Sequence, residues 1–291
     1  MWLQQYLGGE KMQYILKQDQ IIAREEAVVD IEDRGYQFGD GIYEATGVYN
    51  GKSFRMKEHL ERFERSVKGI RLSLPYSIEL LDQKLEELRV ANNFQNGIIY
   101  IQVTRGVAPR NHPFPNATSP QLTAYTIEMQ KPSSEDYETG VDTILVEDIR
   151  WLRCDVKSLN LIPNVLARQA AAEKNCFEAI QYRKEGFITE GSRTNVFMVK
   201  DKRVYTHPAN NYILNGITRA TVIEICEKLG LELIQERFDQ EILLQADEAF
   251  LTGTYMDIVP IRKINGKVIT KEPGPITSLL MENLQRLIEC S

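Results

Sequence analysis

Apolar residues recur at helical spacing in several stretches of the chain. In "MKEHLERFERSVKGIRL", Leu60, Phe63, Val67 and Ile70 fall on one face of a helix whose outer face is charged. Arg62 lies beside this apolar stripe and not opposite it. Four more stretches predict helices by the same spacing: "SIELLDQKLEELRVAN", "NVLARQAAAEKN", "GITRATVIEICEKLG" and "ITSLLMENLQRLIEC".

Strands are predicted between these helices from β-branched and alternating segments. The stretch "IIAREEAVVD" has the interrupted apolar pattern of strands, and "GIIYIQVTRG" and "VDTILVEDIRWLR" each have the composition of one strand. The stretch "FEAIQYRKEGFITEGSRTNVFMVKDKRVYT" has the composition of consecutive hairpin strands. In "EDRGYQFGDGIYEATGVYNG", glycines alternate with aromatic residues, which indicates a strand that passes close to a bulky neighbour. Strands and helices do not alternate strictly, so the pattern favours two α+β domains over a doubly wound sheet.

The polar stretch "QKPSSEDYETG" is the predicted boundary between those domains. We expect an N-terminal extension over residues 1–11, a small N-terminal domain over 12–129, a linker over 130–140 and a larger C-terminal domain over 141–291. The extension lacks the basic start and the long apolar centre of a signal peptide. Met12 is therefore the expected start of the folded part.

Composition argues against several classes of function. Hydrophobic residues make up 43% of the chain and charged residues 26%, which is typical of a globular protein. A net charge of −6 offers no basic surface for nucleic acid or an anionic membrane, and no apolar run is long enough to span a bilayer. The four cysteines are far apart, so we expect reduced thiols in a cytoplasmic protein, and the three scattered histidines predict no metal site.

One lysine stands out in "RWLRCDVKSLN". Lys157 follows an apolar segment and precedes another, so it is expected at a strand end and partly enclosed. Its charged end could extend into solvent from a loop, which is the commoner arrangement. Alternatively, a lysine with a pKa below its usual value could act as a nucleophile or form a Schiff base.

Three further motifs offer chemistry, each with an ordinary alternative. Glu190 ends a strand in "ITEGSRTN", where it could pair with a protonated ring nitrogen or lie in solvent. The start of "GITRATVIEICEKLG" could bind a phosphate through the first N–H groups of the helix, or be an ordinary start capped by threonine. In "TRGVAPRNHPFP", Arg110 and His112 point to the same side of an extended loop and could bind a carboxylate or lie in solvent.

Taken together, a Schiff-base lysine, a carboxylate and a phosphate site are the parts that hold pyridoxal 5′-phosphate. The motifs "YQFGDGIYE", "VTRGVAPRNH", "DVKSLN", "TEGSRTNVF", "NGITR" and "LTGTYMDIVPI" resemble, in this order, those of the bacterial D-amino-acid aminotransferases among the fold-type IV pyridoxal-phosphate enzymes. The resemblance runs from about Tyr14 to Ile264. It implies a smaller N-terminal α/β sandwich and a larger, β-barrel-like C-terminal domain with helices.

The resemblance also implies roles for single residues. Lys157 matches the lysine that binds the cofactor as a Schiff base and then moves the substrate's α-proton, and Glu190 matches the carboxylate that keeps the pyridine nitrogen protonated. Leu214 matches a leucine packed against the ring. The other cofactor-binding residues are expected to be Arg62, Ser192, Ile217, Thr218 and Thr254, with Arg62, Thr254 and the helix start on the phosphate.

For the substrate, the resemblance implies a carboxylate trap made by Tyr43, Arg110 and His112, with Tyr100 in the same region. In the family the loop with the Arg-His pair comes from the neighbouring subunit, so a homodimer is implied. The expected reaction is a ping-pong transamination between a D-amino acid of the D-alanine type and a 2-oxo acid, either 2-oxoglutarate or pyruvate.

Some alternatives remain open. A branched-chain L-amino-acid aminotransferase or a 4-amino-4-deoxychorismate lyase would share Lys157 and Glu190 but not the Arg-His trap. The adjacent Lys157 and Ser158 could indicate a Ser-Lys hydrolase, although neighbours at a strand end point to opposite faces, and a non-catalytic carrier of the cofactor is a further possibility. Two residues depart from the family pattern: Arg193 stands where a small residue is expected, and Gly253 where a side chain is expected.

Overall fold

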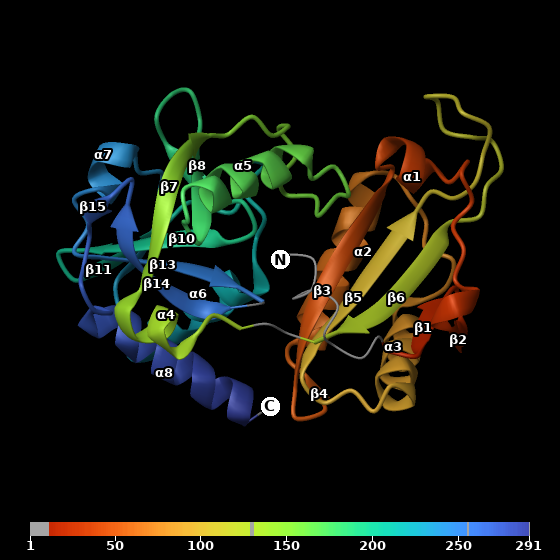
Figure 1. Ribbon diagram of the computed structural model, residues 1–291, viewed down its shortest axis with the longest axis horizontal. Coiled ribbons are helices and arrows are strands. Elements are labelled where there is room, and N and C mark those ends of the chain that lie inside the picture. Colours follow the sequence, from red (N-terminus) through yellow and green to blue (C-terminus); the bar gives the residue numbers. More distant parts are fainter. Residues whose placement is uncertain (1–11, 129–130, 255, 291) are drawn as a thin grey trace. The chain divides into compact units, whose positions relative to one another are not determined.

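The computed structural model describes residues 12–128, 131–254 and 256–290, and the chain divides into two compact units (Figure 1). The first unit contains the residues up to Gln130 together with Val156–Asn160, and the second unit contains Lys131–Asp155 and the residues from Leu161 onward. The predicted extension over residues 1–11 lies outside the described residues. None of the helices in the described ranges combines the length and the apolar composition needed to cross a bilayer.

The first unit is built on a six-stranded sheet with the order β2-β1-β6-β5-β3-β4, in which all neighbouring strands are antiparallel. Helix α2 packs on β3, and α3 packs on β1 and β6 (Figure 1). The elements are β1 (Tyr14–Lys17), β2 (Gln20–Ala23), the 3-10 helix η1 (Arg24–Glu26), α1 (Arg34–Phe38), β3 (Gly41–Tyr49), β4 (Lys52–Ser53), α2 (Met56–Gly69), α3 (Ile78–Ala91), β5 (Gly97–Thr104) and β6 (Gln121–Ile127).

The second unit is built on a nine-stranded mixed sheet that curls into a half-barrel, with the order β12-β11-β10-β13-β14-β7-β8-β9 and β15 paired to β14. Helix α5 packs on β7 and β8, while α6 and α8 pack on each other and on β13. The elements are α4 (Ser134–Thr139), β7 (Val141–Glu147), α5 (Ile162–Glu173), β8 (Glu178–Tyr182), β9 (Ile188–Gly191), β10 (Asn195–Lys200), β11 (Arg203–Thr206), α6 (Ile217–Leu229), β12 (Leu233–Gln235), α7 (Gln240–Leu243), β13 (Glu248–Gly253), β14 (Asp257–Ile264), β15 (Lys267–Val268) and α8 (Pro275–Glu289).

The five helices that the apolar spacing predicts are all present, as α2, α3, α5, α6 and α8. The sheet of the first unit has one apolar and one aromatic face. Ile42 and Ile99 join Phe63 of α2 in the apolar core. Because successive strand residues point to opposite faces, Tyr43 and Tyr100 lie on the other face. Their rings stack with centroids 5.7 Å apart, so two of the predicted substrate residues are side by side.

The strand predicted over residues 141–153 ends early. Strand β7 stops at Glu147, and the apolar residues that gave the remainder the composition of a strand are exposed: Ile149, Trp151 and Leu152. The chain turns after the strand because the carboxylate of Asp148 accepts hydrogen bonds from the backbone N–H and the Nε of Arg150.

The prediction that Lys157 ends a strand is therefore wrong, and Lys157 lies in a loop. This loop extends the free edge of β3 at its start. The backbone N–H of Tyr43 donates to the carbonyl of Lys157 at 2.9 Å, and the N–H of Leu159 donates to the carbonyl of Gly41 at 3.1 Å. The residues around Lys157 thus belong to the first unit, although the chain on both sides belongs to the second.

The glycine-rich stretch does pass close to bulky neighbours, as its composition predicts. A Cβ atom on Gly41 would lie 2.5 Å from the carbonyl oxygen of Val103 and 2.8 Å from the side chain of Leu159. Real Cβ atoms do not come so close to a backbone oxygen, so only glycine fits between β5 and the loop with Lys157.

Two other segments differ from prediction. The strand predicted in "IIAREEAVVD" ends at Ala23 and continues as η1, and Val28 and Val29 are exposed. The stretch expected to be a linker contains helix α4. Ser133 and Asp136 cap the N-terminus of this helix with a reciprocal capping box. The "SSED" letters carry this capping signal, which the polar composition of the stretch obscures.

Candidate active site

Lys157 is half-buried, and its amine faces an aromatic ring. Its Nζ lies 4.2 Å from the centroid of the Tyr43 ring. The backbone of Lys157 is fixed on both sides, because its N–H donates to Ser66 Oγ of α2 and its carbonyl accepts from Tyr43. Among the described residues, no hydrogen bond or ion pair involves Nζ. The position of the amine is therefore set by the backbone hydrogen bonds of Lys157 and by the Tyr43 ring, and no carboxylate of the described residues pairs with Nζ.

A buried polar cluster lies on the opposite face of β3 from Tyr43. Glu44 is fully buried and accepts hydrogen bonds from Arg62 Nε at 2.9 Å and Arg62 Nη2 at 2.7 Å, and its Oε1 lies 3.1 Å from Nδ1 of His59. Burial opposes the charge on Glu44, but Arg62 and His59 hold the pKa of this carboxyl well below its usual range. Arg62, the predicted phosphate ligand, thus has a partner that its position beside the apolar stripe does not reveal.

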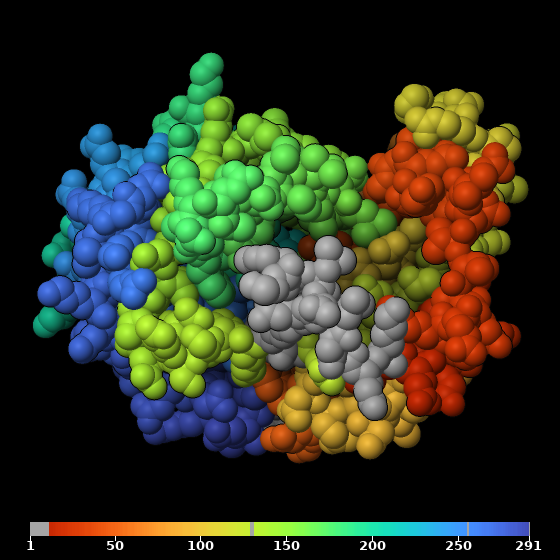
Figure 2. Space-filling view, in the orientation of Figure 1, coloured from red at the N-terminus to blue at the C-terminus, as the bar shows by residue number. Residues whose placement is uncertain are grey.

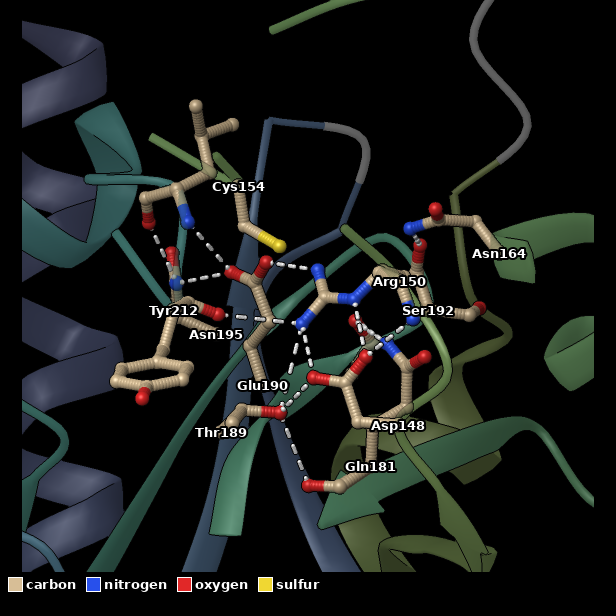
Figure 3. A network of polar contacts seen from close by, with 12 residues as sticks. Asp148, Arg150, Cys154, Asn164, Gln181, Thr189, Glu190, Ser192, Asn195 and Tyr212 are labelled. Carbon is tan, nitrogen blue, oxygen red and sulfur yellow. Dashed lines mark hydrogen bonds and ion pairs between the residues drawn. The ribbon is translucent and has the colours of Figure 1, made fainter. Parts of the chain in front are cut away.

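A second buried network surrounds Glu190 in the second unit (Figure 3). Arg150 donates to Glu190, and it also donates to Asp148 from Nε at 2.9 Å and from Nη2 at 2.8 Å. The other carboxylate oxygen of Glu190 accepts from Asn195 Nδ2 at 2.9 Å and from the backbone N–H of Leu214 at 3.0 Å. The carboxylate is therefore fixed in orientation and does not lie in solvent as an ordinary turn residue.

The pKa of Glu190 is raised above its usual value. Burial is the main cause, and the charge and hydrogen bond of Arg150 and the N–H of Leu214 oppose it without cancelling it. Burial alone would lower the pKa of Arg150, but the carboxylates of Glu190 and Asp148 raise it. The arginine therefore stays charged while Glu190 has an increased affinity for a proton.

Helix α6 begins without a side-chain cap. Its N-cap residue is Gly216, which makes no cap hydrogen bond, so the alternative of a threonine cap is wrong. A Cβ atom on Gly216 would lie 2.2 Å from Oδ1 of Asn195, so only glycine fits here. The N–H groups at Ile217 and Thr218 have no intrahelical acceptor, and a helix start carries partial positive charge.

A buried arginine adds positive charge next to this helix start. Arg219 is 1% exposed, and its acceptors among the described residues are all neutral: Asn215 Oδ1, the carbonyl of His207 and Gln235 Oε1. Its Nε has no partner among the described residues. Burial lowers the pKa of Arg219 to about 10. No pattern in the sequence singles out Arg219, although this residue stands in the "GITR" motif.

The turn after Glu190 is fixed by another buried carboxylate. Glu178 accepts from the hydroxyl of Ser192 at 2.5 Å, from its backbone N–H at 3.2 Å and from Oγ1 of Thr194 at 3.2 Å. Arg193 is exposed between these two residues, with its Cζ 5.7 Å from the centroid of the Phe177 ring.

Two further positions lie near the end of β13. The position of Gly253 has space for a side chain, because the nearest atom to a Cβ there would be 3.6 Å away. Thr254 follows the last residue of the strand and is half-buried.

Arg110 and His112 lie in the exposed loop between β5 and β6, which is drawn in yellow in Figure 2. The Arg110 guanidinium carbon lies 4.4 Å from the centroid of the Phe38 ring, and the His112 ring lies 5.5 Å from it. Both side chains thus contact one ring, and they lie on the same side of the loop as their spacing predicts.

A model of one protein family, amino-transferase class IV, matches residues 41–264 of the chain. The chain belongs to this family. Its members are enzymes that use pyridoxal 5′-phosphate, and their fold is the fold-type IV architecture that the motifs predict.

Several relatives of this aminotransferase cover nearly all of it. The D-alanine aminotransferase of Staphylococcus haemolyticus is 48% identical over 272 residues, which span 93% of this chain and 96% of that protein. The D-alanine aminotransferase of Bacillus licheniformis is 44% identical over 275 residues, which span 94% of this chain and 96% of that one.

Solved structures of branched-chain aminotransferases have the same fold. The branched-chain amino acid aminotransferase of Escherichia coli superposes with a TM-score of 0.92 and 25% identity, covering 96% of this chain and 95% of that one. The enzyme of Thermoproteus uzoniensis, solved with norvaline, superposes with a TM-score of 0.87 and 30% identity, with 95% of each chain covered. The two-domain fold-type IV prediction is confirmed.

The side chains of this aminotransferase fit the cofactor of its family. A carboxylate has about four sites that accept hydrogen bonds, and the described residues fill three on Glu190, which leaves one for a protonated ring nitrogen. Among the described residues, no carboxylate pairs with the buried Arg219 or caps the start of α6, and a phosphate would supply the negative charge that both favour. The amine of Lys157, which forms no ion pair within the described part of the chain, suits a covalent bond to an aldehyde.

Proposed function

We propose that the protein transfers the amino group of a D-amino acid of the D-alanine type to a 2-oxo acid, either 2-oxoglutarate or pyruvate, in a ping-pong reaction with pyridoxal 5′-phosphate. The observation that carries the proposal is the pair of Arg110 and His112, gathered on the ring of Phe38 in an exposed loop. The D-alanine aminotransferases that are 44% to 48% identical to the chain support it. Neither a branched-chain L-aminotransferase nor a 4-amino-4-deoxychorismate lyase needs this pair.

Lys157 is proposed to bind the cofactor and then, once displaced by the substrate, to take the proton from the substrate Cα. When bound, the cofactor supplies an aromatic ring that draws electrons away from that carbon. Glu190 holds a proton at the ring nitrogen, which its raised pKa favours. Leu214 offers its side chain to the ring while its backbone N–H orients Glu190.

The phosphate is proposed to be bound by the helix start and by nearby polar groups. Ile217 and Thr218 offer uncapped N–H groups, and Thr254 offers a half-buried hydroxyl. Ser192 is held by Glu178 in the turn that follows Glu190. Arg62 is proposed as a further member of this set, because the resemblance assigns the phosphate-binding arginine to this position and its guanidinium is buried and held in place by Glu44.

The substrate carboxylate is proposed to be bound by Arg110, His112 and Tyr43, with Tyr100 beside them. An arginine presents two parallel donors that match a carboxylate, and a histidine adds a third. Two carboxylates alternate in this position, that of the amino acid and that of the 2-oxo acid, because both substrates carry the group next to the reacting carbon. The hand of the amino acid follows from where the carboxylate is held, since that decides which face of Cα meets Lys157.

Turnover of D-alanine with 2-oxoglutarate tests the proposal directly. Wild-type protein is expected to form pyruvate from D-alanine and to leave L-leucine unchanged. Lys157→Ala is expected to lose both this turnover and the visible absorbance of the bound cofactor. Consumption of L-leucine without D-alanine would overturn the assignment, and a colourless wild-type protein that borohydride does not affect would favour the Ser-Lys hydrolase.

We further propose a homodimer in which Arg110 and His112 act in the site of the partner subunit. Both residues are exposed in their own chain, as a contribution to another subunit requires. Large apolar side chains are also exposed, which is typical of a surface that another chain covers. They are Val28, Val29, Ile31 and Tyr36 in the first unit and Ile149, Trp151, Leu152, Ile162, Val165 and Leu166 in the second.

Hybrid dimers test this arrangement. Subunits with Lys157→Ala and subunits with Arg110→Ala are expected to be inactive alone at low D-alanine concentration. If Arg110 acts across the interface, each hybrid dimer contains one intact site, so random mixing should restore about a quarter of wild-type activity. No recovery on mixing, or a monomer by light scattering, would show that Arg110 acts within its own chain.

We place the reaction in the cytoplasm. The cysteines of the described residues are all free thiols: Cys154, Cys176, Cys226 and Cys290. Burial raises the pKa of both Cys154 and Cys226 to about 11, which keeps these thiols protonated and unreactive. Free thiols of this kind are typical of proteins in a reducing compartment.

A further inference from the structure

The loop with Arg110 and His112 has no helix or strand of its own. It connects β5, which ends at Thr104, to β6, which begins at Gln121, and most of its residues are exposed. A loop of this length and exposure would sample many conformations if nothing held it. Since a carboxylate is bound well only by donors that are already in position, some other part of the chain has to fix this loop.

Arg34 holds the backbone of the loop. This arginine is the first residue of α1 and is 4% exposed. Its Nη1 donates to the carbonyl of Asn111 at 2.5 Å, and its Nη2 donates to the carbonyl of His112 at 3.2 Å. The rigid fork of a guanidinium can reach two successive carbonyls at once, which a lysine ammonium on a flexible stem does not reproduce.

Asp40 keeps Arg34 in this position and connects it to Arg105, the first residue of the loop. Its Oδ2 accepts from Arg34 Nε at 2.8 Å and from Arg105 Nε at 2.9 Å, and its Oδ1 accepts from Arg105 Nη2 at 2.9 Å. Burial opposes the charge on Asp40, but the two arginines lower the pKa of this carboxyl below its usual value. Arg105 in turn lies over the ring of Phe114, with its guanidinium carbon 3.7 Å from the centroid.

Arg34 binds the backbone of the loop, whereas Phe38 contacts the side chains of Arg110 and His112. It follows Arg34 by four residues on α1, so both side chains lie on one face of the helix. The Phe38 ring has the Arg34 guanidinium carbon at 4.9 Å, that of Arg110 at 4.4 Å and the His112 ring at 5.5 Å from its centroid. A cation is attracted to the face of an aromatic ring, so Phe38 restricts the directions in which Arg110 can point.

Helix α1 is itself fixed to the sheet of the first unit. Asp33 caps the helix by accepting from the N–H of Gly35 at 2.7 Å, and it also accepts from Oγ1 of Thr104 on β5 at 2.9 Å. A Cβ on Gly35 would lie 2.1 Å from the Thr104 side chain, so the helix rests directly on the strand. The support therefore runs from the sheet through α1 to the loop without a flexible step.

We propose that Arg34 and Phe38 are positioning residues for the substrate carboxylate. Arg34 fixes the loop backbone at positions 111 and 112, and Phe38 fixes the side chains of Arg110 and His112. The inference rests on the proposed function, because it takes Arg110 and His112 as the carboxylate-binding pair. The carboxylate is common to both substrates, so losing either support should weaken the binding of the amino acid and of the 2-oxo acid together, without affecting the cofactor.

Steady-state kinetics and hydrogen exchange of the holoenzyme test this role. Arg34→Lys keeps a charge beside Asp40 but loses the fork, and we expect KM for D-alanine and for 2-oxoglutarate to rise about tenfold each, with kcat within about twofold of wild type. Phe38→Leu should raise both KM values about threefold. Amide exchange should become faster in residues 107–114 of Arg34→Lys and stay unchanged elsewhere, and cofactor absorbance should not move.

Two comparisons make the result decisive. Arg203→Lys alters an exposed ion pair with Glu232 in the second unit and should leave KM, kcat and exchange unchanged. If Arg110→Ala raises KM for D-alanine while Arg34→Lys and Phe38→Leu leave both KM values and loop exchange as in wild type, the positioning role is overturned and the proposed function stands. If Arg110→Ala itself leaves KM unchanged, the proposed function fails, and the positioning role fails with it.

Discussion

Two buried carboxylates, one in each unit, lie against an arginine, and their pKa values move in opposite directions. Glu44 has Arg62 as its partner through two nitrogens and His59 as a further neighbour, and its pKa is held far below its usual range. Glu190 is also buried, yet its pKa is raised. Burial and an arginine partner are common to both, so neither feature alone explains the difference.

The difference is in how the arginine is shared. Arg150 forms bonds from Nε and Nη2 to Asp148 and only one, from Nη1, to Glu190. The remaining donors to Glu190 are the neutral amides of Asn195 and Leu214. A cation divided between two carboxylates stabilises each charge less, whereas Glu44 receives two hydrogen bonds from one guanidinium and has His59 as a further neighbour. Glu44 is thus a permanent anion, whereas Glu190 is suited to share a proton.

The most severe test of this comparison is Glu190→Gln. The amide keeps the shape of the carboxylate but cannot hold a proton at the ring nitrogen, so kcat for D-alanine should fall about 10³-fold, near the upper end of what acid-base groups contribute. The thermal midpoint of the holoenzyme should change little, because Arg150 keeps Asp148 as its partner. Single-turnover absorbance measurements give the rate. A loss of less than tenfold would mean that Glu190 has only a structural role.

Glu44→Gln should instead affect stability. Removing this charge leaves Arg62 buried without its carboxylate, and breaking a buried pair costs about 3 kcal/mol of unfolding free energy or more. Denaturant titration of the cofactor-free protein measures the change. The matched control is Glu232→Gln, whose pair with Arg203 is exposed and should contribute less than about 0.5 kcal/mol. Equal effects of the two substitutions would contradict the assignment of Glu44.

Asp148→Asn should make Glu190 resemble Glu44. With Asp148 neutral, the charge of Arg150 serves Glu190 alone, and the pKa of Glu190 should fall. A weaker affinity for the shared proton is expected to lower kcat about tenfold, less than the loss in Glu190→Gln. The pH dependence of kcat, compared with wild type, measures the shift. An unchanged profile would show that sharing of Arg150 does not set the pKa.

The pH dependence of the unfolding free energy should have opposite signs for the two carboxylates, with a change of about 1.4 kcal/mol for each unit by which the folded and unfolded pKa values differ. The folded-state pKa of Glu44 is lowered, so its stabilisation is complete above the unfolded value of about 4.5 and is lost as pH falls through the folded pKa. The folded-state pKa of Glu190 is raised, so stability falls as pH rises from about 4.5 through the folded pKa.

Thermal midpoints of cofactor-free wild type, Glu44→Gln and Glu190→Gln between pH 3.5 and 7 test these signs. The difference between wild type and Glu44→Gln should shrink toward acid pH. The difference in thermal midpoint between wild type and Glu190→Gln should instead decrease as the pH rises above 4.5. If the thermal midpoints of all three proteins depended on pH in the same way, Glu44 and Glu190 would not differ in the direction of their pKa shifts.

The sequence predicts the helices and hairpins well because their apolar spacing is local. Leu60, Phe63 and Val67 are buried on α2 as their spacing requires. Buried charges have no such periodicity. Arg150 stands in a segment with the composition of a strand, and its partner Glu190 is forty positions away. Arg34 likewise binds carbonyls more than seventy positions later in the chain.

The sequence does contain a signal for Glu44, the buried partner of Arg62. Glu44 stands two positions after Ile42 on the same strand, so its side chain points into the apolar core. A charged residue on the apolar face of a strand requires a buried partner. Arg62, on the edge of the apolar stripe of α2, is the arginine that provides this partner.

The return of residues 156–160 to the first unit has a consequence for how the chain is made. A nascent chain that has reached Gln130 carries all six strands of the first sheet, but the start of β3 still lacks its edge partner. That partner emerges only after β7 of the second unit has been synthesised. Lys157 is thus among the last residues to join the first unit, and a fragment cut at Gln130 lacks Lys157 together with the segment that pairs with the start of β3.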